Sequence, residues 1–318
     1  MRAFVYTDSK ATERPFAEGV SASGSTDLVW LHLDGQMAEA RDWIDAQTCI
    51  PSIVRGALRA SETRPRSDIL DEGSIINLRG LGENPDDAAD PLVSIRFWAE
   101  KGRVISLSYR PLEGLKDVVE RFLSGQINDP GDLITSFATE MSKGLDPKVA
   151  ALGDGLDGIE AQIEENNARS TRRKVSKIRA QAIGYRRFVA PQREALERLA
   201  AARCIWLDEE DQSHLREASD RYARMAEELE AVRERAAVVH DELTDLRTER
   251  MDARALLISI VALIFLPLTF ITGLLGMNVQ GIPHADKPWA FWGVVGLCTF
   301  LGMAVLGYFI RLRWVRDR

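Results

Sequence analysis

Cysteine and histidine are scarce in this chain. Only three of its 318 residues are Cys and four are His. Cys49, Cys204 and Cys298 lie far apart in the sequence, which excludes a disulfide framework and a cysteine-rich metal cluster and suits a reducing cytosol. A phosphate-binding glycine loop and a His-Glu-x-x-His motif are also absent. We therefore expect a protein that is not an enzyme and that has no resident cofactor.

Positive charge is in deficit as well. The 48 acidic residues outnumber the 41 basic ones and give a net charge of −7, which argues against a nucleic-acid partner. The first ten residues, MRAFVYTDSK, contain no apolar core of a signal peptide. With 45% hydrophobic and 28% charged residues, most of the chain is expected to face water.

Glycine and proline are nearly absent from one long stretch. Between Gln192 and Thr272 there is no Gly, and Pro267 is the only Pro. Apolar and small residues recur there at alternating steps of three and four, which predicts a heptad seam that needs a partner helix. The seam consists of Leu215, Ala218, Tyr222, Met225, Leu229, Val232, Ala236, Val239, Leu243 and Leu246. Asp208 and Asp211 are suitable caps for the start of this helix, which would span roughly 95 Å.

Two uncharged apolar segments stand close together near the end of the sequence. The first covers residues 256–275 and the second residues 289–310, and each is long enough to cross the ~30 Å hydrocarbon core of a membrane. Arginines precede the first segment and follow the second, whereas Lys287 is the one basic residue between them. The positive-inside rule therefore predicts that both termini are cytoplasmic and that the loop is outside.

One face of the first apolar segment is small or polar. Its residues fall at steps of three and four, so they share a stripe of one helix. The stripe consists of Asp252, Ala255, Ser259, Ala262, Leu266, Thr269, Gly273 and Gly276. Several copies around an axis would enclose a water-filled pore lined by this stripe. Alternatively, the small residues let helices pack closely, and composition alone leaves both interpretations open.

The first 130 residues mix strand-like and helical patterns, which predicts an α/β module. Residues 29–33 and 74–78 indicate strands, and residues 92–99 and 104–109 indicate a hairpin around a glycine turn at 100–103. Helical patterns fall at residues 51–60 and 112–123. The acidic stretch at residues 82–90 would suit a metal, but a solvated loop explains it more simply.

The segment from Phe265 to Asn278, FLPLTFITGLLGMN, strongly resembles the CorA superfamily of divalent-cation transporters. That family carries the signature Gly-Met-Asn, here Gly276, Met277 and Asn278, at the outer end of the first of two C-terminal spans. The resemblance implies an α+β cytoplasmic domain, long helices and a two-span membrane domain in a funnel-shaped homopentamer. It also implies an inner-membrane protein whose partners are further copies of itself, the bilayer and divalent cations.

The residues after the signature are most similar to the family's bacterial zinc transporter branch, ZntB. They read Val279-Gln280-Gly281-Ile282-Pro283, followed by His284. Magnesium-type members usually have aromatic residues on both sides of the signature and an acid in the loop. Imidazole favours Zn²⁺, whereas Mg²⁺ prefers oxygen ligands. We therefore expect Zn²⁺ as cargo, with Asn278, His284 and Asp286 as candidate metal ligands.

These patterns combine into one expected organisation. The divisions are residues 1–130 (cytoplasmic α/β domain), 131–207 (helical layer), 208–275 (stalk helix and first span), 276–288 (outer loop), 289–310 (second span) and 311–318 (basic tail). In the expected mechanism a ring of Asn278 carbonyls meets the hydrated cation, Leu266 gates by dewetting, and Asp252 forms an inner acidic ring.

Other interpretations remain open. The same family includes magnesium and cobalt transporters, and a membrane-tethered coiled-coil scaffold or signalling protein would also explain the heptads and the two spans. The sequence does not distinguish a passive channel from proton-coupled transport, or import from export.

Overall fold

The computed structural model describes residues 1–22, 27–60, 64–71, 73–84, 90–161, 168–277, 282 and 287–316. The chain divides into two units, Met1–His240 and Asp241–Arg318, and each is described by itself.

The first unit contains a seven-stranded sheet in the order β2-β1-β3-β7-β6-β5-β4. Its strands are β1 (Arg2–Thr7), β2 (Lys10–Arg14), β3 (Leu28–Asp34), β4 (Arg66–Ile69), β5 (Gly73–Leu81), β6 (Leu92–Glu100) and β7 (Arg103–Ser108). β3 and β7 pair in parallel, and every other neighbouring pair is antiparallel. The expected hairpin is confirmed as β6 and β7, with Glu100 opposite Arg103. Gly102 in its turn has a φ of 72°, a value that favours glycine.

Helices cover both faces of this sheet. α1 (Phe16–Ala22), α2 (Ala38–Ala46) and α3 (Ser52–Arg59) belong to one core, and α4 (Leu115–Leu123) and α5 (Pro130–Glu160) pack on the other face. Trp30 of β3 anchors the second core: its ring stacks on Phe4 at 4.5 Å and meets Phe137 of α5 edge-on at 5.7 Å. The buried Trp30 indole donates a hydrogen bond to Ser106 Oγ at 2.8 Å, so its polar atom is satisfied.

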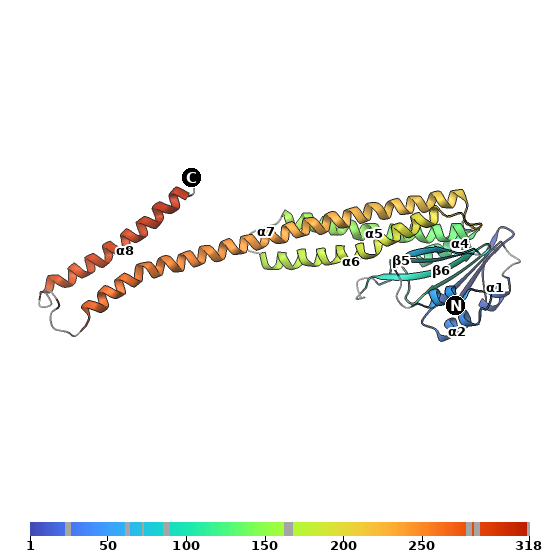
Figure 1. Cartoon of the computed structure of the whole chain (residues 1–318), viewed down its shortest axis with the longest axis horizontal. Helices are drawn as coiled ribbons and strands as arrows, with labels where there is room; N and C mark the ends of the chain where they lie inside the picture. The colour runs from blue at the N-terminus through green and yellow to red at the C-terminus, as the bar shows by residue number, and fades with distance from the viewer. Residues whose placement is uncertain are drawn as a thin grey trace. The chain divides into compact units, whose positions relative to one another are not determined.

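α7 (Glu209–Leu275) lies beside α5 and α6 (Ala168–Ala200) within the first unit (Figure 1). The nine seam residues from Leu215 to Leu243 are at most 3% exposed, and Leu246 is half-buried. Arg235 of α7 pairs with Glu160 of α5 at 2.6 Å, and Arg186 of α6 pairs with Glu230 at 2.7 Å. The partner helices that the heptads require are therefore supplied by the same chain, and the seam needs no dimeric coiled coil.

The edge of β5 is closed by a side chain of α6. β4 pairs with β5 over Ser74–Asn77, which leaves the peptide groups of Arg79 beyond the end of β4. Gln192 accepts a hydrogen bond from Arg79 N at 2.6 Å and donates one to Arg79 O at 2.9 Å. Arg79 also places its guanidinium over the Phe188 ring, 3.8 Å from the centroid.

The second unit contains the rest of α7 and α8 (Pro288–Arg316). Both helices are long and apolar enough to cross a membrane, and none of the most apolar stretch of either is buried within the chain. Pro267 lies inside α7. A proline in a membrane helix is tolerated where a neighbour or water satisfies the carbonyl that it frees.

Candidate ion pathway

The stripe of small and polar residues lies on one continuous helix. All eight members, from Asp252 to Gly276, are exposed, and Leu266 is the bulkiest of them at 75% exposure. The chain thus leaves this stripe uncovered by its own atoms, together with most of the apolar residues on the other faces of the helix. A single such helix encloses no water, so a pore requires further copies.

Two hydroxyls along this part of α7 donate hydrogen bonds within the helix. Ser259 Oγ donates to Ala255 O at 2.9 Å, and Thr272 Oγ1 donates to Leu268 O at 3.0 Å. A hydroxyl that donates in this way keeps two lone pairs as acceptors. Ser259 can therefore present an oxygen to a hydrated cation without leaving a donor unpaired in an apolar environment.

Gly276 closes the outer end of α7. Its N–H donates to Thr272 O at 2.9 Å, and a Cβ at this position would lie 2.9 Å from the same oxygen. A side chain would push the backbone away, so the helix end itself favours glycine here. Met277 follows and is 48% exposed. The three candidate ligands Asn278, His284 and Asp286 lie outside the described residues.

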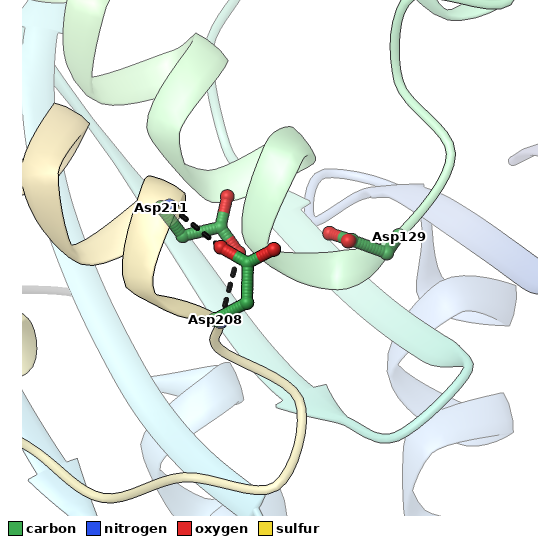
Figure 2. Close-up of side chains that lie close together, drawn as sticks. All are labelled: Asp129, Asp208 and Asp211. Carbon is green, nitrogen blue, oxygen red and sulfur yellow. Dashed lines mark hydrogen bonds between the residues drawn. The ribbon is translucent and has the colours of Figure 1, made fainter.

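A second group of oxygen ligands, which sequence reasoning did not single out, lies where the N-termini of α5 and α7 meet. Asp129, Asp208 and Asp211 each offer a carboxylate oxygen within 4.8 Å of the others (Figure 2). Asp129 accepts from the N–H of Asp132 at 2.8 Å and caps α5. Asp208 accepts from Asp211 N at 2.8 Å, and Asp211 accepts from Asp208 N at 3.2 Å. This reciprocal capping box confirms the expected start of the helix.

The surroundings of this cluster disfavour the ionised form of its carboxylates. Asp211 is 2% exposed, and its burial, followed by the neighbouring carboxylate of Asp129, raises its pKa to about 7. Burial also raises the pKa of Asp129 and of Asp132. Near neutral pH the cluster is therefore partly protonated. Its carboxylates also cap the N-termini of α5 and α7, so the charge at these caps depends on pH.

The comparison with known families decides the identity of the chain. The model of the CorA-like Mg²⁺ transporter protein family matches residues 25–311, which includes the α/β domain from β3 onward, all three long helices and most of α8. The chain belongs to this family. The resemblance of residues 265–278 to the CorA superfamily is thereby confirmed, and so is the architecture that it implied: a mixed α/β domain, long helices and two candidate membrane helices.

Relatives within the CorA-like family cover nearly the whole chain. The divalent cation transporter CmaX of Pseudomonas aeruginosa is 33% identical over 292 residues, 90% of this chain and 87% of that protein. The zinc transport protein ZntB of Pectobacterium carotovorum is 30% identical over 304 residues, 93% of each chain. A solved structure of the full-length CmaX protein matches with a TM-score of 0.79 at 30% identity and covers 99% of this chain and 98% of its own.

The buried carboxylate of Asp211 predicts a pH-dependent stability for this CorA-like chain. Its pKa rises from 3.8 to about 7 on folding, so between these values the folded state binds more protons and stability falls as pH increases. Asp211→Asn removes this dependence, and its midpoint of thermal unfolding relative to wild type should rise from pH 5 to pH 8. About 1 kcal/mol corresponds to roughly 2–4 °C in a domain of this size. Circular dichroism of the full-length protein in detergent measures the effect.

The control is Asp220→Asn, which removes an exposed carboxylate from the same helix. Its pH profile should follow that of the wild type. Parallel profiles for Asp211→Asn and the wild type would show that Asp211 is ionised throughout this range.

Proposed function

We propose that the chain carries divalent metal cations, Zn²⁺ foremost, through a pore lined by the stripe from Asp252 to Gly276. The observation that supports this most is the Gly276-Met277-Asn278 signature at the end of a helix whose small and polar stripe is exposed along its whole length. The similarity to a divalent cation transporter and to zinc transport proteins supports the same function. A magnesium or cobalt transporter of this family is the alternative.

We infer that five copies surround the pore, as the family resemblance implies, in an inner membrane with both termini in the cytoplasm. An added Cβ at Gly273 would meet no atom within 4 Å in the described part of the chain, so packing within the chain does not require glycine there. Close approach of a neighbouring copy to this residue would require it. The arginines that flank the two spans support the orientation.

The proposed mechanism keeps water around the ion. Five Asn278 amide oxygens accept hydrogen bonds from the first hydration shell and carry no net charge that would trap the cation. Thr269 and Ser259 supply hydroxyl oxygens deeper in the pore, Leu266 forms an apolar constriction that gates by dewetting, and Asp252 attracts cations at the inner end.

Uptake of Zn²⁺ and Mg²⁺ into proteoliposomes tests the proposed cargo. Zn²⁺ flux above Mg²⁺ flux is expected, because imidazole of His284 favours Zn²⁺. Repeating the assay with a pH gradient separates passive from proton-coupled transport. Native mass spectrometry should give a particle near five times 35.5 kDa. Mg²⁺ flux without Zn²⁺ flux would return the chain to the magnesium branch, and a dimer without flux would favour the scaffold.

The constriction at Leu266 predicts a leaky variant. Leu266→Ser is expected to raise basal cation leak severalfold, since the free energy of wetting a narrow pore depends on the polarity of its lining. Leak of Zn²⁺ from preloaded liposomes measures it. Leu257→Ser is the matched control: it makes the same change at a residue that is 64% exposed and lies off the stripe, and it should leave the leak unchanged. Equal leak from both variants would place the gate elsewhere.

A further inference from the structure

α6 carries a concentration of positive charge that its surroundings do not neutralise. From residue 168 to 193 the sequence contains nine Lys and Arg residues and no Asp or Glu, although the whole protein has a net charge of −7. The nine residues are Arg169, Arg172, Arg173, Lys174, Lys177, Arg179, Arg186, Arg187 and Arg193.

Some of these side chains have partners within the chain. Arg186 pairs with Glu230 at 2.7 Å, Arg193 lies 3.9 Å from Glu197, and Arg172 lies 3.2 Å from His240 Nε2. Five others are exposed and form no ion pair among the residues that the structure describes. We call these five the basic α6 face: Arg173, Lys174, Lys177, Arg179 and Arg187.

The centre of this face is open to an approaching surface. Arg173, Lys177 and Arg187 lie along one row of the helix, and Ala180 and Gly184 stand between them. An added Cβ at Gly184 would meet no described atom within 4 Å. Long basic side chains around small residues leave room for another helix to approach.

A complementary negative surface lies elsewhere on the same helical layer. Asp146 and Asp154 of α5 and Glu228 of α7 are exposed, and no ion pair joins any of them to a cation among the described residues. Partial burial, followed by the charges of Asp146 and Asp154, raises the pKa of Glu228, so the three carboxylates repel one another. We call these three residues the acidic α5–α7 patch.

The two surfaces lie on different sides of the layer and at the same level along it. Arg173, Lys177 and Arg187 of the basic α6 face lie on the side of the helix opposite its buried residues Val175, Ala182 and Val189. The acidic patch is formed by residues of α5 and α7. A Cβ on Gly155 would lie 3.4 Å from Ile178 Cδ1, and one on Gly153 would lie 3.7 Å from Glu228 Oε1. Asp154 and Glu228 are therefore level with Arg179.

We propose that the basic α6 face docks on the acidic α5–α7 patch of a neighbouring copy of this chain. Copies that are related by rotation about an axis parallel to these helices have equivalent residues at the same height along the axis. The basic α6 face of one copy can therefore meet the acidic α5–α7 patch of the next copy at a matching height. Repetition of such a head-to-tail contact generates a closed ring. The inference rests on the proposed ring of copies and names the surfaces that hold its cytoplasmic part together. A polyanion is a less favourable partner for the basic α6 face, because the net charge of −7 on the protein repels it.

Charge reversal in the full-length protein tests this contact. Lys177→Glu with Arg179→Glu reverses the basic face, and Asp154→Lys with Glu228→Lys reverses the patch. Each pair should raise the dissociation constant of the ring by roughly tenfold or more, since like charges then face each other. The variant with all four changes should restore assembly. Lys10→Glu with Lys101→Glu is the matched control and should assemble as the wild type does. Both lysines are exposed, one in β2 and the other in the turn between β6 and β7.

Zero-length carbodiimide crosslinking of the unmodified protein provides a second measurement that does not depend on the folding of a variant. A mixture of ¹⁴N- and ¹⁵N-labelled copies should yield a Lys177–Asp154 or Lys177–Glu228 crosslink between differently labelled peptides. The crosslink should weaken at high salt, which screens exposed charges.

The outcomes separate this inference from the proposed function. A ring that survives every reversal, with crosslinks confined to single copies, would overturn the inference and leave the transporter intact. An unmodified protein that forms no ring would overturn both. If the basic-face variant keeps the ring but loses binding to phosphatidylglycerol vesicles or to single-stranded DNA, the face serves a polyanion and the inference is wrong.

Discussion

Replacing Asn278 with Ala is expected to reduce cation uptake at least about tenfold while the protein still assembles in the membrane. The proposed mechanism places an amide oxygen of each copy at the pore mouth, where it accepts hydrogen bonds from the hydration shell of the ion. The substitution removes the whole ring of oxygens at once, because every copy carries it. Zn²⁺ uptake into proteoliposomes at equal protein content measures the effect.

Gln280→Ala is the matched control, because it removes the same amide group two residues beyond the signature. It should retain most of the uptake, and native mass spectrometry should show the same assembly for both variants. Uptake close to normal in Asn278→Ala would assign Asn278 a structural role at the helix end and would move the selectivity site elsewhere.

Gly131→Ala is expected to destabilise the first unit. The added Cβ would lie 1.7 Å from Asp211 Oδ2, and Asp211 is a short, buried side chain at the start of α7 that also accepts from Asp208 N. Overpacking of this kind costs about 1–3 kcal/mol, which outweighs the gain of up to ~1 kcal/mol for Ala over Gly in a helix. Denaturant unfolding of the full-length protein in detergent, followed by circular dichroism, measures the change.

Gly158→Ala tests the same substitution in the same helix without the clash. An added Cβ there meets no described atom within 4 Å, so this variant should be more stable than the wild type by up to ~1 kcal/mol. Opposite signs for the two variants are the expected result. Equal stabilisation by both would mean that Gly131 and Asp211 are not in contact.

The parts of the fold that are marked by a local sequence pattern were predictable from the sequence. The β6–β7 hairpin is marked by its glycine turn, and the long α7 by its heptads and lack of breakers. β1, β2 and β4 were not predicted. β2 and β4 are short, mostly polar segments that pair at the two edges of the sheet, so they lack the apolar alternation of a buried strand. The seam predicted that α7 has partners, but which helices they are depends on long-range packing.

The candidate site also has a part that was predictable from local sequence and a part that was not. The stripe and the signature follow from spacing along one helix, so sequence alone placed Asp252 and Gly276 on a common face. The carboxylates of Asp129 and Asp211 meet only because two helices that are distant in sequence start at the same place. The capping pattern at Asp208 was the available signal for half of that cluster. The net charge of −7 did not reveal the unpaired basic residues of α6, because the total charge of a chain does not show how the charges are distributed along it.

The hydrogen bonds of Gln192 protect the newly made chain from aggregation before it is inserted into the membrane. An open strand edge is a template on which a strand of another molecule can add, and such pairing begins aggregation. The amide of Gln192 occupies both peptide groups of Arg79, as a further strand would. Once α6 has docked, both peptide groups of Arg79 in a newly made chain are therefore paired and cannot receive a strand of another molecule.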